Sequence, residues 1–381
     1  MSATLSPVTS LGRVAVVAGV LTLAVGIALG WAELRVVGLA CLVAFAIAVV
    51  TCLGRQSYQA QVTLDSQRVK VGEEVFGSIV IRNTTSGRRF RTTFEVPVGK
   101  GRATFGLPTL GRDEHYEQKF RVPTRRRGVV RVGPVRSVRS DPLMLMRRVE
   151  SWSEIEELYV HPDTILLRSG SSGFLRDIEG ITTQQLSSSD VSFHALRDYQ
   201  RGDDRRAVHW RTTARLGRLV VRQFEETRRA HLLVLLSLRA EHYANDEEFE
   251  LAVSCAGSLA AMALREDRKL SVHTQGRELR PHAIPLVLDQ LSGVETQAGA
   301  LGLAALTAGA VSRVPNASVI AIVTGSATDV LELRAARAHI PIDIASFALR
   351  CGAQPRRASA GDLTVLDIAQ LGQLPRAIRE V

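Results

Sequence analysis

The stretch His231-Leu-Leu-Val-Leu-Leu-Ser-Leu238 decides the fold of the C-terminal half of the chain. It is a continuous apolar run, as expected for a strand of a parallel sheet that is buried on both faces. Residues 246–266 follow and show the spacing of an amphipathic helix. The side chains that we expect on its buried face are Phe249, Val253, Ala256 and Ala260. A buried strand followed by a long helix indicates the first unit of an α/β fold.

The same alternation of strand and helix continues to the C-terminus. Further strands are predicted over residues 270–274, 318–323 and 340–345. Helices near residues 301–311 and 328–338 are predicted to separate the later strands. We therefore expect residues 230–381 to form a doubly wound, mostly parallel α/β sheet, in which ligands normally bind at the carboxyl ends of the strands.

An arginine-rich block, residues 193–229, precedes this sheet. Asp203 or Asp204 is placed to cap a short helix that Gly217 would end, and a strand over residues 219–224 would follow. One side of this helix is expected to hold Ala207, Trp210 and Ala214, beside a stripe of Arg211, Arg215 and Arg218. Ten arginines and five acids lie between Arg197 and Arg229, so internal ion pairs account for part of the charge.

Residues 56–160 have the pattern of a small antiparallel β-sandwich. Short strands are predicted at 61–64, 74–82 and 91–98, separated by turns such as Val71-Gly72-Glu73 and Asn83–Gly87. The run Arg125-Arg126-Arg127 makes this domain basic, which suits an edge beneath anionic lipid headgroups. We favour that interpretation over nucleic-acid binding, because no aromatic-rich stacking surface accompanies the arginines. Residues 161–192, rich in Ser and Gly, are predicted to be a linker or mobile loop.

The N-terminal region, residues 1–55, contains two uncharged stretches of 19 residues, 14–32 and 36–54. Each is close to the length that a helix needs to cross a bilayer, about 20 residues. Only Glu33-Leu34-Arg35 separates them, so they must form an antiparallel hairpin, with Trp31 placed for the membrane interface. The pair is flanked by Arg13 on one side and by Arg55, Arg68 and Lys70 on the other, which predicts that both termini and the soluble domains are cytoplasmic.

Two other interpretations of this N-terminal region are less favourable. A cleaved signal peptide would need a clean small-x-small site before Glu33, which the sequence lacks, and a second span follows at once. A buried hairpin of a soluble protein would seldom contain two such uncharged stretches.

Composition agrees with this organisation. The chain has 381 residues, enough for more than one domain, and a formal net charge of +10. Such a charge suits an anionic membrane surface or an acidic partner, and it also permits nucleic acid. The four cysteines form no CxxC motif and no zinc-binding spacing with histidine, so we expect a reducing compartment without disulfides.

The arginine-rich block resembles the signature of the bacterial "domain of unknown function 58" family. In this chain the pattern comprises Arg197, Tyr199, Gly202, Asp203, Asp204, Arg206, His209, Trp210, Arg215, Arg222 and Glu225. The order of segments is similar as well. Members typically have two N-terminal membrane spans, a β-rich segment ending in Asp-Pro (here Asp141-Pro142), this block and a C-terminal von Willebrand factor A-like domain.

The resemblance implies a role rather than a reaction. Family members are commonly encoded beside MoxR-type AAA+ ATPases and are thought to act with them in assembling or activating other proteins. The signature residues have two interpretations at this point. They either join the block to the sheet, through buried ion pairs and an aromatic anchor at Trp210, or contact the partner directly.

The resemblance also raises the question of a metal site. Von Willebrand A domains often bind Mg²⁺ through Asp-x-Ser-x-Ser after the first strand, with a Thr and an Asp on later loops. The matching positions here are Ser237, Arg239 and Glu241, and the later strand ends at Thr324 without the expected Asp. A guanidinium in that position would repel a cation. We therefore expect no metal and no cofactor, and a salt bridge from Arg239 to Glu241 or to the signature block.

Motifs of catalysis are missing from the sequence. It contains no Gly-x-x-x-x-Gly-Lys, no Gly-x-Ser-x-Gly and no His-Glu-x-x-His. The leading hypothesis is therefore a non-catalytic, membrane-anchored adaptor. The alternatives are a basic membrane-surface scaffold that binds nucleic acid or anionic lipid, and a hydrolase without a recognisable motif.

Overall fold

The computed structural model describes residues 7–52, 58–84, 92–167, 192–225, 231–279 and 282–380. The chain divides into two compact units, Met1–His161 and Pro162–Val381, and each is described by itself. The predicted flank residue Arg55, most of the turn after Asn83 and residues 168–191 of the predicted linker lie outside the described residues.

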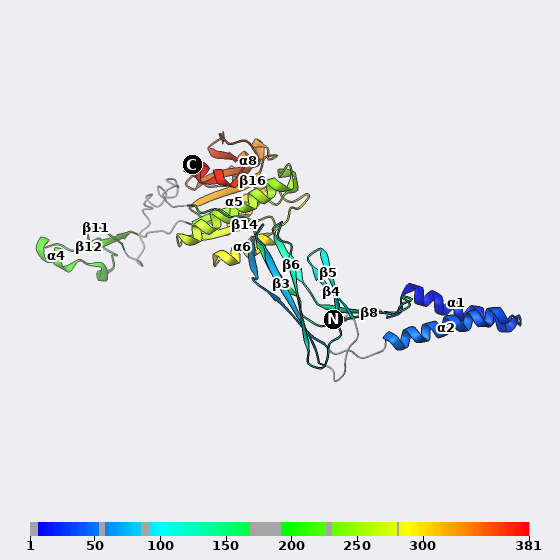
Figure 1. Cartoon of the computed structure of the whole chain (residues 1–381). Coiled ribbons are helices and arrows are strands. Elements are labelled where there is room, and N and C mark those ends of the chain that lie inside the picture. Colours follow the sequence, from blue (N-terminus) through cyan, green and yellow to red (C-terminus); the bar gives the residue numbers. More distant parts are fainter. Residues whose placement is uncertain are drawn as a thin grey trace. The chain divides into compact units, whose positions relative to one another are not determined.

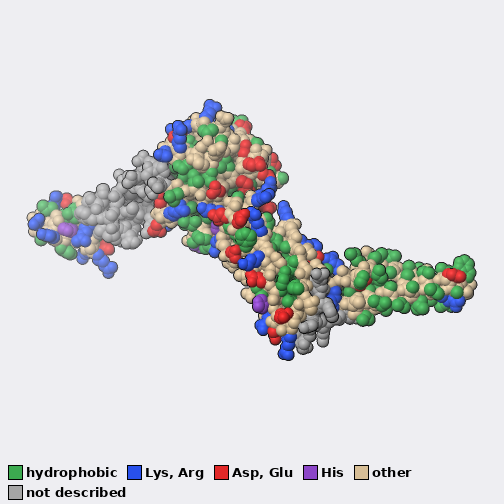
Figure 2. Space-filling view, viewed as in Figure 1, with side chains coloured by type: hydrophobic (Ala, Val, Ile, Leu, Met, Phe, Trp, Pro, Cys, Tyr) green, Lys and Arg blue, Asp and Glu red, His purple; other side chains and the backbone are tan. Residues whose placement is uncertain are grey.

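The N-terminal unit begins with two apolar helices, α1 (Ser10–Ala28) and α2 (Ala32–Cys52), which pack as the predicted hairpin (Figure 1). Both are long and apolar enough to cross a membrane. Hydrophobic side chains cover their visible face, and charged side chains gather at the turn (Figure 2). Each helix starts four residues before its predicted span, at Ser10 and Ala32, because the helical backbone continues through the charged flanks.

Small residues bring the two helices together. Gly12, Gly19 and Gly26 are the buried residues of α1, at intervals of seven. A Cβ added at Gly19 would lie 3.1 Å from the Cβ of Cys41, and one at Gly26 would lie 2.8 Å from the backbone nitrogen of Arg35. The helices therefore approach through glycine, as membrane helix pairs commonly do.

The rest of this unit is the predicted β-sandwich. Its strands are β1 (Tyr58–Leu64), β2 (Arg68–Lys70), β3 (Val75–Asn83), β4 (Thr92–Val98), β5 (Gly101–Leu107), β6 (His115–Val122), β7 (Gly128–Val132), β8 (Arg136–Ser140), β9 (Arg147–Ser151) and β10 (Glu156–His161). One sheet has the order β1-β3-β6, and the other has β2-β10-β7-β4-β8-β9, with β5 paired to β4. Pairing is antiparallel except between β2 and β10. Ile79, Ile81 and Phe94 are fully buried in the core.

The C-terminal unit contains the predicted α/β sheet. Its elements are β13 (His231–Leu236), α5 (Asp246–Arg265), β14 (Lys269–Thr274), β15 (Arg277–Leu279), α6 (Ile284–Ser292), α7 (Leu303–Arg313), β16 (Val319–Gly325), α8 (Val330–Arg337), β17 (Ala345–Cys351), β18 (Arg356–Ala360), β19 (Leu363–Ile368) and α9 (Leu374–Arg379). The strand order is β15-β14-β13-β16-β17-β19-β18. The central strands are parallel, and β15 and β18 are antiparallel edges.

Strand β13 shows why the sheet is doubly wound. Its residues alternate between two cores: Leu232 and Leu236 pack in a cluster with α5, whereas Leu233 and Leu235 pack in a cluster with α7 and α8. Both faces are therefore covered by helices, which explains the continuous apolar run. The predicted inner face of α5 is confirmed, since Phe249, Val253, Ala256 and Ala260 are all buried.

One predicted strand of this unit is wrong. Residues 340–344 form no strand, and the strand runs instead over Ala345–Cys351. Pro341 lacks a backbone N–H and cannot join a ladder as a central residue. Ile340 and Ile344 are nevertheless buried beneath α8, which accounts for their apolar character. Helices α6 and α9 and the β18–β19 hairpin had no prediction.

The arginine-rich block forms a small module, residues 192–225, here called the signature module. It pairs β11 (Ser192–Asp198) with β12 (Val220–Glu225) and carries the 3₁₀ turn η2 (Arg205–Ala207) and helix α4 (Trp210–Leu216) between them. Gly217, with φ of +66°, ends α4 as predicted. The helix expected from Asp203 or Asp204 is interrupted, because Val208 pairs with Val221 in a β-bridge. Asp204 caps only η2, and His209 caps α4.

Candidate functional site

The carboxyl edge of the α/β sheet is the first candidate site. Strand β13 lies between β14 and β16, so the chain leaves β13 towards one neighbour and later returns to the other. The loops after β13 and β16 therefore diverge, and ligands of doubly wound sheets bind at such a point. Ser237 to His242 follow β13, and Thr324 is the last residue but one of β16. All four predicted positions, Ser237, Arg239, Glu241 and Thr324, belong to this edge.

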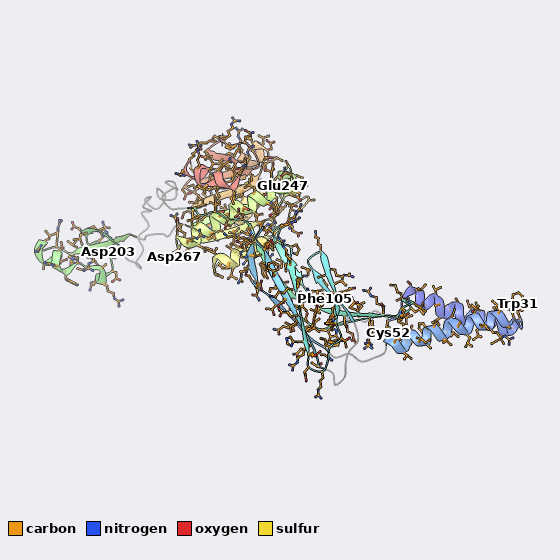
Figure 3. The ribbon with its side chains drawn as sticks, in the orientation of Figure 1. Trp31, Cys52, Phe105, Asp203, Glu247 and Asp267 are labelled. Carbon is orange, nitrogen blue, oxygen red and sulfur yellow. The ribbon has the colours of Figure 1, made fainter. Side chains whose placement is uncertain are left out.

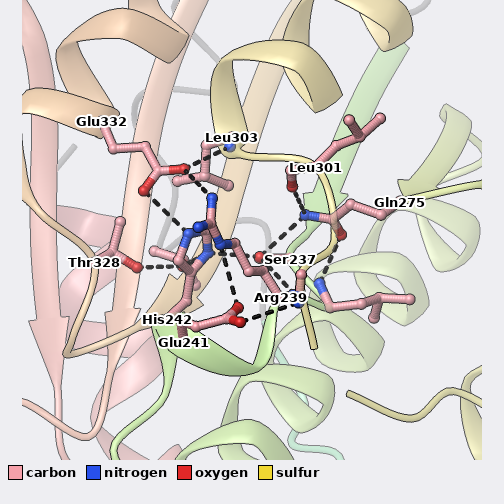
Figure 4. A network of polar contacts seen from close by, with 12 residues as sticks. Ser237, Arg239, Glu241, His242, Gln275, Leu301, Leu303, Thr328 and Glu332 are labelled. Carbon is pink, nitrogen blue, oxygen red and sulfur yellow. Dashed lines mark hydrogen bonds and ion pairs between the residues drawn. The ribbon is translucent and has the colours of Figure 1, made fainter. Parts of the chain in front are cut away.

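A chain of three polar side chains crosses the edge (Figure 4). Ser237 Oγ lies 2.7 Å from His242 Nδ1, and His242 Nε2 lies 3.1 Å from Glu332 Oε2. Ser237 Oγ accepts hydrogen bonds from Gln275 Nε2 and the Arg239 backbone N–H, at 3.2 and 3.3 Å. Its own proton is therefore available for Nδ1, which leaves the imidazole proton on Nε2, facing the carboxylate.

Burial disfavours the charged form of this histidine. Only 3% of the His242 side chain is exposed. Burial lowers the pKa of His242 below its usual value, although the Glu332 carboxylate acts in the opposite direction. A neutral imidazole has one donor and one acceptor, and both are used here.

Arg239 stands beside this chain. Its Nε lies 3.2 Å from Glu241 Oε2, so the predicted salt bridge is present, and its Nη1 lies 3.9 Å from Glu332 Oε1. Glu241 also accepts from the Gly299 backbone N–H at 3.0 Å, and Glu332 accepts from Leu303 N–H at 2.9 Å. The guanidinium and the two carboxylates therefore join the loop after β13 to α8 and to the loop before α7.

A third carboxylate, that of Glu248, joins the two divergent loops. Glu248, on the first turn of α5, is 8% exposed and accepts from the backbone N–H of Ala244 and of Ser326. Ser326 Oγ donates to the same carboxylate at 2.7 Å. The loops after β13 and β16 are thus connected at two places, and the edge is a closed polar network rather than an open crevice.

The chemistry open to this network is limited by burial. Serine hydrolases use a serine–histidine–acid chain of the same connectivity, with an accessible nucleophile. Ser237 is fully buried here, and its oxygen already accepts two hydrogen bonds. Within the described residues, no group of three or more His, Cys, Asp or Glu side chains is arranged to hold a metal.

The signature module is the second candidate site. Arg197 and Asp203 form a two-pronged ion pair, with nitrogen–oxygen distances of 2.8 and 2.7 Å (Figure 3 labels Asp203). Asp203 also accepts from the Gln200 N–H. The Arg197 guanidinium is the main cause that lowers the pKa of Asp203. Gly202, with φ of +111°, permits the tight turn between these partners.

Only part of the predicted signature set is brought together. Tyr199 joins the module through its backbone N–H, which donates to Leu219 O, and the His209 ring contacts Thr212 Oγ1 at 2.7 Å. Arg206, Arg215 and Arg222 are exposed. The backbone of Glu225 pairs with that of Ser192. The ion pairs described in the module are internal: Arg197 with Asp203, and Arg218 with Asp198.

The Trp210 side chain is not buried, whereas an aromatic anchor would be. Its side chain is 65% exposed on the first turn of α4, and Leu216 at the end of α4 is 54% exposed. Trp210 and Ala214 lie one turn apart, as do Arg211 and Arg215, and all four are exposed. The outer face of α4 therefore combines an indole with two guanidinium groups.

Sequence reasoning missed His242, Gln275, Glu248 and Glu332. The sequence indicated His242, because it lies only three residues after Arg239 in the loop that follows β13. Glu332 lies 90 residues further along the chain. The switch-point rule places the start of the helix after β16 at this edge, and that rule would have selected it.

The chain is thus a multidomain protein. It has a helical hairpin, a β-sandwich and a mostly parallel α/β sheet with a closed polar edge. The family described as "Protein of unknown function DUF58" matches residues 195–285. This match confirms the resemblance predicted from the signature, and it covers the signature module from Ala195 together with the first part of the α/β sheet.

The other comparisons add likenesses of low score. No curated protein matches the chain. The CARDB domain of a Pyrococcus furiosus protein, solved with di-metal ions, is 12% identical, with a TM-score of 0.22 over 28% of this chain and 93% of that one. A β-glucosidase from Listeria innocua is 14% identical, with a TM-score of 0.19 over 28% of this chain and 16% of that one. Scores this low leave the fold and the function to be argued from the residues of this chain.

Proposed function

We propose that this chain is a membrane-anchored, non-catalytic adaptor. Helices α1 and α2 hold it in a bacterial plasma membrane, with both termini and both units on the cytoplasmic side. Its von Willebrand A-like sheet and its signature module bind a MoxR-type AAA+ ATPase that assembles or activates other proteins. The observation that carries this proposal is the exposed face of α4, with Trp210 at its centre.

The size of the signature module supports a binding role for that face. Its buried side chains include only three valines, Val208, Val220 and Val221, among those described. So small a core contributes little stability, and elements of this length rarely stand alone. A partner that covers Trp210 and Leu216 would bury the apolar surface that the module itself leaves exposed.

The chemistry of the face indicates the kind of partner surface. Tryptophan and arginine are the residues most enriched where binding energy is concentrated. Arg211 and Arg215 repel each other at one-turn spacing, and acidic side chains on a partner would relieve that repulsion. We therefore expect an acidic surface with a pocket for the indole.

The closed polar edge of the sheet supports the non-catalytic part of the proposal. Its serine is buried, and its arginine is engaged with Glu241 and Glu332. A network with this many partners holds the loops in one arrangement. Such an edge presents a fixed contact surface, which is what an adaptor needs.

Capture of a MoxR-type ATPase by the immobilised protein tests the proposal. The full-length protein in detergent is immobilised, and a purified MoxR-type ATPase is added with ATP analogue, with ADP or without nucleotide. Trp210→Ala should weaken binding about 30-fold, the value for a binding residue worth about 2 kcal/mol. Ile342→Ala is the matched control, because Ile342 is an apolar side chain with 93% exposure in the loop that leads into β17, at the opposite end of the strands from the carboxyl edge.

Two outcomes would contradict the proposal. One is no capture of the ATPase by the wild-type protein in any nucleotide state. The other is equal loss of binding in Trp210→Ala and Ile342→Ala. Binding of nucleic acid instead would appear as an affinity that falls steeply with salt, because phosphate contacts release counterions.

A further inference from the structure

The turn between β8 and β9 has an unusual composition for a surface turn. Its sequence is Asp141-Pro-Leu-Met-Leu-Met146, with one charge and five apolar residues. Leu143 and Met144 are 58% and 67% exposed, whereas Leu145 and Met146 are buried. Two adjacent large apolar side chains at the tip of a turn indicate a contact with another protein or with a membrane.

This turn is bound to the base of the helical hairpin. The Thr9 backbone N–H donates to Leu145 O at 3.0 Å, and the Arg147 N–H donates to Pro7 O at 2.8 Å. Thr9 Oγ1 donates to Met144 O at 2.8 Å. Val8 and Met146 form a β-bridge. Figure 1 shows β8 directed towards the base of α1.

The contacts extend into the uncharged part of α2. Leu145 and Met146 form a buried cluster with Ala48 and Cys52. Helix α2 ends at Cys52, so at 1.5 Å per residue Ala48 lies about 6 Å inside the end of the helix. The turn therefore lies level with residues that lipid would surround if α2 crosses a bilayer.

Hydrogen bonds within the turn satisfy the backbone N–H groups of Leu143, Met144 and Met146, and Thr9 donates to the carbonyl oxygens of Met144 and Leu145. The buried Asp141 carboxylate accepts from the backbone N–H of Leu143 at 2.9 Å and of Met146 at 2.6 Å. The Met144 N–H donates to Asp141 O at 3.0 Å. A turn whose backbone groups are paired in this way can enter the edge of a bilayer at little cost. Arginines on the adjoining strands, Arg136, Arg139, Arg147 and Arg148, suit the anionic headgroups beside it.

We propose that Leu143 and Met144 insert into the boundary between headgroups and acyl chains of the membrane that α1 and α2 cross. This inference rests on the proposed membrane anchoring and adds a third point of contact with lipid. It holds for either orientation of the helices, because the turn contacts the end of the hairpin that joins the β-sandwich.

Photolabelling from lipid tests this inference. The full chain is reconstituted in vesicles whose phospholipid carries a diazirine on an upper acyl carbon, the vesicles are irradiated, and adducts are mapped by peptide mass spectrometry. Adducts are expected on α1, on α2 and on Leu143–Met144. Ile155 is the internal control, because it is an apolar side chain of the same β-sandwich, is 53% exposed and follows the other end of β9.

A paired variant keeps the test sharp. Met144→Asp should abolish the adducts at Leu143, because a carboxylate resists entry into lipid, while Ile155→Asp should leave them unchanged. Adducts on both helices in each variant show that the hairpin is intact.

The outcomes separate the two proposals. Adducts on the helices without adducts at Leu143–Met144 would overturn this inference and leave the anchor in place. A lack of adducts on the helices as well would overturn the anchor, and this inference with it.

Discussion

Ser237 lies at the centre of the polar network, and its replacement is the sharpest test of a structural role at the residue scale. Ser237→Ala would leave His242 Nδ1, Gln275 Nε2 and the Arg239 N–H without this partner. We expect a loss of about 1–3 kcal/mol in the free energy of unfolding of the α/β sheet unit. The measurement is the urea concentration at which the buried Cys255 and Cys351 become labelled by a thiol reagent.

The control for this variant is Ser312→Ala, at an exposed serine of α7, which should change stability by less than about 0.5 kcal/mol. Because Ser237 is buried, we also expect no labelling of the wild-type chain by a serine-reactive fluorophosphonate. Labelling that disappears in Ser237→Ala would revive the hydrolase hypothesis.

The residues of this network show what the sequence could and could not predict at this scale. Ser237, Arg239 and Glu241 were predicted because the resemblance to von Willebrand A domains places a motif directly after the first strand. The partner of His242 was not predictable from spacing, since Glu332 approaches only when α8 packs beside β16. A hydrogen bond between distant segments leaves no periodic pattern in either segment.

At the scale of elements, the close packing of α1 on α2 predicts that a disulfide can join the two helices. The Cβ of a residue at position 19 would lie 3.1 Å from Cys41 Cβ, close to the separation of about 3.5–4.5 Å in a disulfide. Gly19→Cys should therefore form a disulfide with Cys41 when membranes are treated with a mild oxidant. The cross-linked peptides of α1 and α2 would be detected by mass spectrometry.

The matched control is Val20→Cys, one position along α1 at a side chain that is 51% exposed. It should remain uncrosslinked, because it points away from α2. Equal cross-linking at both positions would show that the helices do not pack through Gly19.

Elements were predicted where one periodic pattern determined them. The 20-residue helix α5 agrees with its predicted bounds because its apolar face is unbroken. The strand placed at 340–345 failed because Ile340 and Ile344 are apolar for another reason, as loop residues beneath α8. The helix of the signature module was divided by a β-bridge at Val208, which depends on tertiary pairing and not on helix propensity.

Histidines of the sheet give a prediction for the C-terminal unit as a whole. Burial lowers the pKa of His231, His242 and His273. Each imidazole therefore binds a proton less readily in the folded state than in the unfolded state, where its pKa is about 6.5. Stability should fall as the pH drops below about 6.5 towards the lowered pKa values.

The measurement is the urea midpoint of Cys255 labelling at pH 7.5 and at pH 5.5, with dithiodipyridine, which reacts at acid pH. The midpoint should be lower at pH 5.5, and the difference should shrink in His242→Gln. A midpoint that is equal or higher at pH 5.5 would contradict the assignment of neutral histidines.

At the scale of the whole molecule, the order of segments was predictable and the function was less so. Hydrophobic length indicated the hairpin, alternation indicated the sandwich, and the apolar run at β13 indicated the sheet. The exposed state of Trp210 was not predictable, because an indole at helical spacing suits an anchor as well as a binding face. Solvent exposure is a property of the folded chain.

The contact between Thr9 and Leu145 has a consequence for biogenesis. It joins residues 136 positions apart. A ribosome that adds about 5–20 residues per second needs on the order of 7–30 s to make the intervening chain. Helices α1 and α2 are therefore complete for that time while their base is still uncovered. A nascent chain that stalls before residue 141 would therefore leave Ala48 and Cys52 at that base without their cover.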